Sequence, residues 1–295
     1  MVILGDLTDA KDYHPAELII RIFKELTALV EEFGVEVRIL CGNHDYQREG
    51  AAPFSVLSHV PGITFITTPD ETDGDATCLW LPHTKTPVVD WQAFDFTHFN
   101  YVFIHQPVNG CKANNGSTMT SALGTDFGGA RVLAGDIHVP QRVGDVEYIG
   151  SPYHVHFGDK FAPRVLLITR RGCEDLEVNC ASMHVLEAAT SRDLRQALRK
   201  ATAGDLVKVR GVLPRAEHHL WPAWRKEAKL AVEQAECILC GVELRTPQTR
   251  ERVARNQKIS RYTTPESAVV AYVSQEGLGA SALDLGLDIM EGATS

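Results

Sequence analysis

The first 170 residues alternate short apolar runs with one amphipathic stretch and with polar, glycine-rich segments. The apolar runs predict buried strands at residues 2–4, 36–40, 63–67, 77–81, 100–104, 131–134, 146–149 and 165–169. Residues 15–33 carry apolar side chains at helical spacing, with proline at the start and glycine just after the end, and this predicts an amphipathic helix. Strands that alternate with helices and loops indicate an α/β fold.

A different pattern begins near residue 181. The spacing there predicts a helix at 191–200, a strand at 206–212, a long helix at 219–235, a strand at 237–244 and helices at 265–275 and 281–290. The alternation of the first part ends around residues 170–172, so we expect two domains, 1–180 and 181–295. A chain of 295 residues is long enough for two domains of ordinary size.

The composition is that of an ordinary soluble globular protein, with 44% hydrophobic and 23% charged residues. No apolar run approaches the ~18 residues of a membrane span. The first residues lack the basic and small-residue pattern of a signal peptide. The seven cysteines are odd in number and scattered, unlike a disulfide framework. We therefore expect a cytoplasmic protein without membrane association.

The net charge of −9 conceals an uneven distribution along the chain. Residues 1–180 hold 13 Lys and Arg against 24 Asp and Glu, whereas residues 181–295 hold 16 against 14. Six basic residues and one acidic residue lie within 245–261. An acidic part that could hold cations is thus joined to a basic stretch that could hold a polyanion. A solvated helix face is the alternative explanation of that stretch.

Four polar clusters each follow a predicted strand directly. They are Gly-Asp-Leu-Thr-Asp at 5–9, Gly-Asn-His-Asp at 42–45, Ile-His-Gln-Pro at 104–107 and Gly-Asp-Ile-His at 135–138. Ligand sites of α/β sheets collect beyond the carboxyl ends of the strands, so these loops are expected to converge. Carboxylate, amide oxygen and imidazole together suit Mn²⁺, Fe²⁺ or Zn²⁺. One such cluster would be an ordinary turn or core histidine, but four in this order predict a metal site.

These clusters resemble the motifs of the calcineurin-like metallophosphoesterases, which run Asp-x-His, Gly-Asp-x-x-Asp/His, Gly-Asn-His-Asp/Glu, a single His and Gly-His-x-His. The chain matches this series from the second motif onward. It is most similar to the SbcD-type nuclease subunits of DNA repair and recombination, through Gly-Asp-Ile-His-Val-Pro-Gln at 135–141, Tyr-Ile-Gly-Ser-Pro-Tyr at 148–153 and Phe-Gly-Asp at 157–159. The resemblance covers about residues 2–170. It implies a two-sheet α/β/β/α sandwich with a small C-terminal α+β capping domain.

Carried over residue by residue, the resemblance implies a centre with two Mn²⁺ ions, with Mg²⁺ as the alternative metal. Asp6 would bridge both ions. The ligands that complete the shell of one ion would be Asn43, His105 and Asp136. His138 would bind the other ion.

The resemblance also implies the reaction, which is phosphodiester hydrolysis. His44 would act at the scissile phosphate, by protonating the leaving oxygen or by stabilising developing charge. Asp45 would orient His44 from outside the metal shell.

Two positions depart from the family pattern. The first Asp-x-His motif is absent, because Met1 lies only five residues before Asp6, and this indicates a misassigned start or a shortened product. The second ion keeps only Asp6 and His138, so we expect that ion to bind weakly and the activity of this chain to be reduced. Asp136 stands where the family usually has histidine, and a carboxylate there favours Mn²⁺ or Mg²⁺ over Zn²⁺.

Three functions are open from the sequence. The first is an Mn²⁺-dependent DNA exonuclease or endonuclease. Its phosphate contacts would come from the basic stretch, through Arg250, Arg252, Arg255 and Lys258. The second is a phosphoesterase for small substrates, and the third is a catalytically weak subunit that binds DNA or an ATPase. The resemblance implies DNA and an SbcC-type ATPase subunit as partners, with a homodimer as a further expectation.

Two pairs of side chains lie outside these motifs. His154 and His156 follow Gly-Ser-Pro beside the expected site, and both substrate contact and solvent-facing strand positions are open for them. Trp221 and Trp224 are expected to pack the second domain rather than stack on bases.

Overall fold

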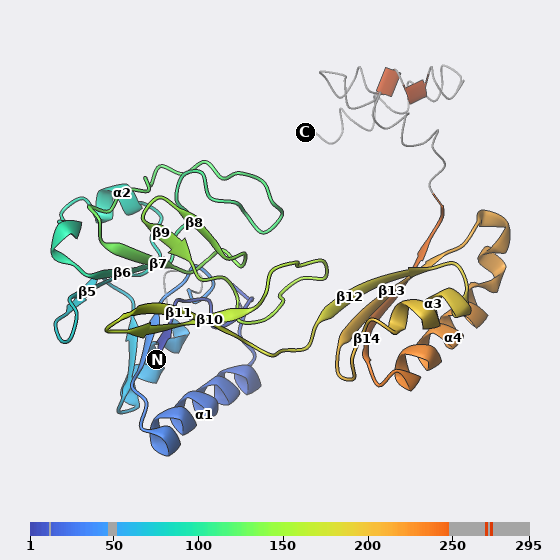
Figure 1. Cartoon of the computed structure of the whole chain (residues 1–295), viewed down its shortest axis with the longest axis horizontal. Coiled ribbons are helices and arrows are strands. Elements are labelled where there is room, and N and C mark those ends of the chain that lie inside the picture. Colours follow the sequence, from blue (N-terminus) through green and yellow to red (C-terminus); the bar gives the residue numbers. More distant parts are fainter. Residues whose placement is uncertain (12, 47–51, 248–268, 271, 274–295) are drawn as a thin grey trace. The chain divides into compact units, whose positions relative to one another are not determined.

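The structure is a computed structural model, shown in Figure 1, and it describes residues 1–11, 13–46, 52–247, 269–270 and 272–273. The chain divides into two compact units, Met1–Met183 and a second unit that begins at His184. Each unit has its own buried apolar clusters.

The first unit contains a three-stranded parallel sheet with the order β1-β2-β3. Its strands are β1 (Val2–Ile3), β2 (Val37–Leu40) and β3 (Ile63–Ile66). Helix α1 (Ala16–Phe33) begins after Pro15 and ends at Gly34, which adopts a left-handed φ of 62°. The apolar stripe of α1 packs against β2 and β3, together with the 3-10 helix η2 (Pro53–His59). One face of this sheet is thus covered.

The same unit contains a six-stranded sheet with the order β4-β5-β6-β7-β9-β8. Its strands are β4 (Asp70–Thr72), β5 (Cys78–Leu81), β6 (Tyr101–Ile104), β7 (Arg131–Ala134), β8 (Gln141–Val143) and β9 (Val146–Tyr148). The four central strands pair in parallel, and the edge strands β4 and β8 pair antiparallel. The sheet is therefore mostly parallel.

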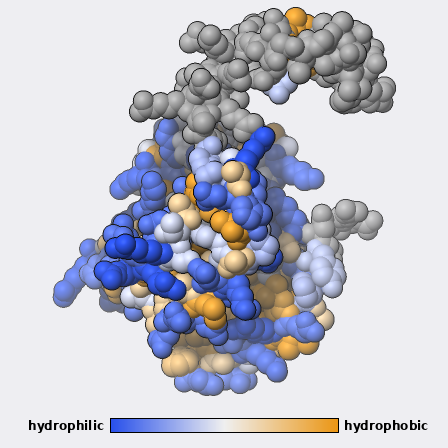
Figure 2. All heavy atoms as spheres, turned by 90° about the vertical axis from the view of Figure 1, so that its right-hand side faces the viewer, coloured by the Kyte–Doolittle hydropathy of each residue, from blue (hydrophilic) through white to orange (hydrophobic). Residues whose placement is uncertain are grey.

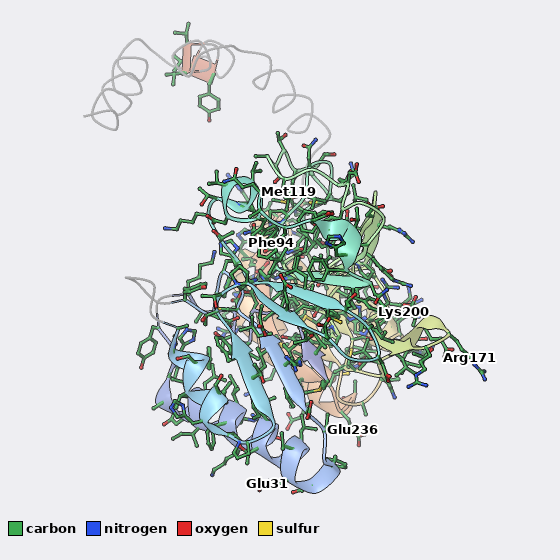
Figure 3. All side chains as sticks on the ribbon, turned by 90° about the vertical axis from the view of Figure 1, so that its left-hand side faces the viewer. Glu31, Phe94, Met119, Arg171, Lys200 and Glu236 are labelled. Atoms are coloured by element: carbon green, nitrogen blue, oxygen red, sulfur yellow. The ribbon has the colours of Figure 1, made fainter. Side chains whose placement is uncertain are left out.

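The two sheets share an apolar cluster. Leu40 of β2 and Ile66 of β3 lie in one buried cluster with the side chains Trp80, Phe103 and Leu133 of the six-stranded sheet. The opposite face of the larger sheet carries a second cluster, which also contains residues near α2 (Pro87–Asp90) and the 3-10 helix η3 (Phe96–His98). Figure 3 labels two side chains at the border of that cluster, Phe94 and Met119.

A hairpin follows the larger sheet. Strands β10 (Arg164–Thr169) and β11 (Gly172–Glu177) pair antiparallel from Arg164 opposite Glu177 to Thr169 opposite Gly172. Arg171 lies at its tip in Figure 3. The change of pattern that the sequence places at residues 170–172 is thus the turn of this hairpin, and β11 continues the first unit.

The second unit is a three-stranded sheet with two helices. Its elements are β12 (Met183–Ala188), α3 (Ser191–Leu198), β13 (Leu206–Val212), the 3-10 helix η4 (Arg215–Leu220), α4 (Trp221–Gln234) and β14 (Ile238–Arg245). The sheet order is β12-β13-β14, and β13 and β14 run parallel. Buried side chains of β13 alternate with half-buried ones, and the buried set packs on α3 and α4. Hydrophilic residues predominate on the face turned to the viewer in Figure 2, with a few separated apolar ones.

The tryptophan pair packs this unit, as the sequence predicts. Trp221 and Trp224 stack with ring centroids 5.3 Å apart, and Trp224 is buried. They lie over Gly211 of β13, where a Cβ would come within 2.6 Å of the Trp221 ring and 2.8 Å of the Trp224 ring. Only glycine fits that strand position without displacing an indole.

The predicted mixed α/β class is confirmed, with several mostly parallel sheets. The predicted strands and helices up to residue 245 are found, most with ends shifted by one or two residues. Strands β4, β8, β11 and β12 are absent from the sequence prediction. The helix predicted at 281–290, and most of the one at 265–275, lie outside the described residues. Within the described ranges, no helix is long and apolar enough to cross a membrane.

Candidate metal centre

The two sheets of the first unit bring their strand ends together. Strands β1, β2, β6 and β7 each run into one of the four polar clusters predicted from the sequence. The His83 backbone N–H after β5 donates to the Cys41 carbonyl after β2 at 2.8 Å. The His105 ring after β6 hydrogen-bonds the Leu4 carbonyl after β1. Because these bonds cross between the two sheets, they bring the carboxyl ends of β1, β2, β5 and β6 to one place. The Gly135 N–H after β7 donates to the Ile104 carbonyl of β6 at 3.0 Å, so the end of β7 lies there too.

His105 occupies the middle of this place, and its side chain is only 1% exposed. Nδ1 faces the Leu4 carbonyl, so Nδ1 carries a proton and donates it. Nε2 lies 3.3 Å from Asp6 Oδ2, 3.3 Å from Asn43 Oδ1 and 3.9 Å from Asp136 Oδ1. In the neutral ring Nε2 thus directs its lone pair toward three oxygens.

This set of atoms fits a divalent cation. The oxygens and Nε2 are all acceptors, and only a proton on Nε2 or a cation among them removes their mutual repulsion. Atoms that bind one ion at about 2.0–2.2 Å lie about 3–4 Å from one another, which agrees with the separations at Nε2. Asp6, His105 and Asp136 each offer one ligand atom, and these atoms all lie within 4.8 Å of one another. The Asn43 oxygen, 3.3 Å from His105 Nε2, offers a fourth candidate ligand atom.

The charges in this group act on one another. Burial opposes a charged imidazole, but the hydrogen bond and negative charge of Asp6 prevail and raise the pKa of His105. Burial also opposes a charged Asp6, but His105 and the backbone N–H of His44 prevail and lower the pKa of Asp6. Both pKa shifts indicate that the surroundings of Asp6 favour a positive charge next to its carboxylate.

Asp45 holds two of the loops together. It is fully buried, and its carboxylate accepts the backbone N–H groups of Asp6 at 2.8 Å, Leu7 at 2.9 Å and Gly42 at 2.8 Å. Burial raises the pKa of Asp45, while these backbone donors oppose that rise. The sequence predicts that Asp45 orients His44. Its hydrogen bonds among the described residues go to the backbone, so it positions His44 through the loop and not through the ring.

Two ligands stand in strained backbone conformations. Asp6 has a φ of 55° and Asp136 a φ of 73°, in the left-handed region that non-glycine residues rarely adopt. Each follows a glycine that lies against His105. A Cβ on Gly5 would collide with the His105 ring, and a Cβ on Gly135 would come within 2.9 Å of Nδ1. The glycines let both loops close on the imidazole, and the strain turns the carboxylates inward.

His44 is held apart from the ligand group. Its backbone N–H donates to Asp6 Oδ1 at 2.9 Å, and its ring Nδ1 bonds the carbonyl of Asp9. Nδ1 therefore carries the proton in the neutral ring, and Nε2 stays available to a substrate. A half-buried imidazole fixed on one side, next to a ligand but outside the ligand group, is what a proton-transfer role needs.

His138 lies outside the group of three, although it follows Asp136 by two residues. Its Nδ1 is buried without a hydrogen-bond partner. Its ring lies 5.6 Å from the ring of His156, centroid to centroid, with an interplanar angle of 37°. Burial and the neighbouring His156 lower the pKa of His138, which favours the neutral ring with one unprotonated nitrogen. The segment with His154 and His156 is a turn, not the strand that the sequence allowed.

Sequence reasoning missed His83. This half-buried residue follows β5, and its ring lies 6.2 Å from the ring of His105 at an interplanar angle of 82°. Burial lowers the pKa of His83, and His105 lowers it further. The signal was the segment Leu81-Pro82-His83, in which a turn residue and an imidazole follow a strand as in the four predicted clusters.

The four basic residues predicted to contact DNA, Arg250, Arg252, Arg255 and Lys258, lie outside the described residues. Comparisons of this chain with protein-family models and with curated proteins gave no match. Its chemistry is therefore inferred from its own residues.

Proposed function

We propose that this chain is an Mn²⁺-dependent phosphodiesterase that acts on DNA, similar to SbcD-type nucleases. The observation that carries the proposal is the convergence of Asp6, Asn43, His105 and Asp136 around one point. Three oxygens and one imidazole nitrogen, with no thiolate, favour Mn²⁺ or Mg²⁺ over the softer metals. A divalent ion in such a site supplies neutralisation of phosphate charge and a more acidic water.

The surrounding residues prepare this site for a phosphodiester. The Asp9 carbonyl fixes the His44 ring, so that Nε2 can give a proton to the leaving oxygen or stabilise charge on the phosphate. Asp45 holds the loops that carry Asp6 and His44 in register. His105 donates Nδ1–H to a backbone carbonyl, which orients its other nitrogen toward the ligand oxygens.

The layers of the first unit support the fold that the resemblance implies. Helix α1 covers one sheet, the two sheets share a cluster, and α2 and η3 border the outer cluster of the larger sheet. We propose that this is the α/β/β/α sandwich of the metallophosphoesterases, and that the second unit is a small α+β capping domain. The SbcC-type ATPase subunit and the homodimer stay predictions.

His44 offers a direct test of the proposed reaction. We expect His44→Ala to reduce Mn²⁺-dependent cleavage of linear DNA by about 10²–10⁴-fold, because general acid catalysis contributes a factor of this order. Mn²⁺ binding measured by calorimetry should not change, because His44 is not in the ligand group. His59→Ala, at an exposed histidine in η2, is the matched control. Equal rates for His44→Ala and the control would remove His44 from the reaction.

The substrate class is tested separately. Neutralising Arg250, Arg252, Arg255 and Lys258 together should weaken DNA binding and flatten its salt dependence, by about 0.9 in slope for each phosphate that the protein no longer neutralises. Hydrolysis of a small chromogenic phosphodiester should stay unchanged. An unaltered salt slope would assign the basic stretch to a solvated face. Hydrolysis of the small diester without cleavage of DNA would favour the small-substrate phosphoesterase, and binding of DNA without any hydrolysis would favour the binding subunit.

A further inference from the structure

A pair of histidines lies beside the ligand group without being part of it. The His138 and His156 rings approach with centroids 5.6 Å apart. The His138 Nδ1 is buried and bonded to nothing in the described structure, whereas buried polar atoms nearly always have a partner. His156 is exposed, so one side of the pair is open to solvent and to ions.

The spacing of the rings suits a shared ion. A ring nitrogen binds a divalent metal at about 2.0–2.1 Å, which places the ring centroid about 3.2 Å from the metal. Two imidazoles on one ion therefore have centroids about 4.5–6 Å apart, and the observed separation of 5.6 Å lies within that range.

The segment that carries His156 is fixed against the strand end that carries His138. The Ser151 N–H donates to the His138 carbonyl at 2.9 Å. Further along, the Asp159 carboxylate accepts the backbone N–H groups of Val155 at 3.0 Å and His156 at 2.8 Å. These bonds close a turn that sets the position of His156, so its approach to His138 is built into the loop.

The neighbouring histidine of the same segment has a different environment. His154 Nε2 bonds the carbonyl of Phe161 at 3.0 Å, and its ring lies against the Phe161 ring. Its Nδ1 is also buried without a hydrogen-bond partner in the described structure, but its Nε2 is held by its own loop and its ring lies against a phenylalanine, not against a second imidazole. The two histidines of one short segment therefore provide a candidate ligand and a matched control.

We propose that His138 and His156 bind a second divalent ion beside the Asp6–His105–Asp136 group, with His156 as a ligand supplied by the 151–159 turn. The role of this ion rests on the proposed function, because a two-metal phosphodiesterase needs a second ion next to the first. The motifs in the sequence give that ion only two protein ligands, Asp6 and His138, and His156 adds a third.

The test is to measure Mn²⁺ binding to the full 295-residue chain, by calorimetry and by electron paramagnetic resonance of the free ion. We expect two Mn²⁺ ions per chain, one of them weaker. His156→Ala should lower the affinity for the second ion at least about tenfold, since even the loss of a residue that only hydrogen-bonds a metal ligand lowers metal affinity by about 10–100-fold. His154→Ala should leave both affinities unchanged. Because His156 is exposed, its removal leaves the core intact, and circular dichroism checks this.

A second readout does not depend on affinity. Mn²⁺ added in excess of the first site should broaden the imidazole NMR signals of His138 and His156 together and spare those of His154. The proposal is overturned if His156→Ala binds both ions as the wild type does, or if one Mn²⁺ binds with no second ion at millimolar metal. If the wild type bound no Mn²⁺ at all, both this proposal and the proposed function would be overturned. Asp136→Asn distinguishes the two sites, because it should weaken binding of the first ion alone.

Discussion

In the second unit, Glu243 of β14 lies 2.5 Å from the Lys208 ammonium and 3.3–3.4 Å from the guanidinium groups of Arg210 and Arg245. In the first unit, Asp6 and Asp136 lie around one buried imidazole. Within the described part of the chain, no Lys or Arg nitrogen lies within 4.0 Å of either aspartate. The Glu243 carboxylate is matched by lysine and arginine charges, whereas the two aspartates share the single imidazole of His105.

This comparison separates carboxylates that are paired with basic side chains from carboxylates that are placed to bind a cation. A carboxylate among lysine and arginine groups needs nothing further, and exposed pairs of this kind contribute little to stability. Carboxylates gathered on one imidazole destabilise the fold by mutual repulsion unless a cation joins them. Asp45 is a third case, because its charge is met by backbone N–H groups alone. The three cases predict three different responses to the same substitution, carboxylate to neutral.

The largest loss of stability is expected at Asp45. Asp45→Ala leaves the N–H groups of Gly42, Asp6 and Leu7 without their acceptor, and a buried unsatisfied donor costs about 1–3 kcal/mol. We expect a loss of about 3 kcal/mol or more in the free energy of unfolding, measured with urea. Asp45→Asn keeps one acceptor oxygen and should lose less. A loss below about 1 kcal/mol for the alanine variant would show that water replaces the carboxylate easily.

A smaller effect, conditional on metal, is expected at Asp136. Without metal, Asp136→Asn should not lower the stability, because it removes like-charge repulsion next to Asp6. With Mn²⁺ at 100 times its dissociation constant, the wild type should gain about 2.7 kcal/mol, and the variant should lose most of that gain. Unfolding curves with and without Mn²⁺ measure both quantities. Asp73→Asn, at an exposed aspartate, should retain the full gain. Equal gains in Asp136→Asn and in this control would exclude Asp136 as a ligand.

The smallest effect is expected at Glu243. The Lys208 and Arg245 side chains lower the pKa of Glu243 from 4.5 to about 2, so its ionised form stabilises the fold above pH 4.5. That contribution is lost as the pH falls from 4.5 toward 2. Glu243→Gln should lower the melting temperature at pH 7 by at most about 2–3 °C, because the Glu243 side chain is 32% exposed and water screens its charge. The difference from wild type should shrink as the pH is lowered below 4.5. A difference that stays constant with pH would point to packing rather than charge.

The parts of the fold that follow from burial were predictable from the sequence. Strand β7 is Arg131–Ala134 as expected, because a central parallel strand is apolar on both faces. The missed strands are polar or lie at edges. Strand β4 reads Asp-Glu-Thr and β11 reads Gly-Cys-Glu-Asp-Leu-Glu, and both form through antiparallel backbone pairing with the strand next to them in the chain. Such pairing depends on backbone hydrogen bonds, so it leaves no pattern of apolar side chains in the sequence.

The candidate metal site, like the fold, has parts that were predictable from the sequence and parts that were not. Asp6, Asn43 and Asp136 were predictable because each follows an apolar strand and a glycine that can be read locally. His105 was predictable because it follows an apolar strand directly. The approach of His156 to His138 was not predictable, because it depends on how the 151–159 turn folds back onto the end of β7. The backbone contacts of Asp45 were hidden for a similar reason, since their partners at Asp6 and Leu7 come from another loop.

The hydrogen bond between His105 and the Leu4 carbonyl joins residues 101 positions apart in the chain. Asp6 and His105 meet across a similar separation, so no local segment of the chain can form the ligand group alone. Loop closure over such distances is slow, and contacts of this kind form after local helices and hairpins. Mn²⁺ binding should therefore report the last stage of refolding. Mn²⁺ added at the start of refolding should leave the early rate unchanged and slow only the reverse reaction, since the ion recognises the chain once the two sheets have docked.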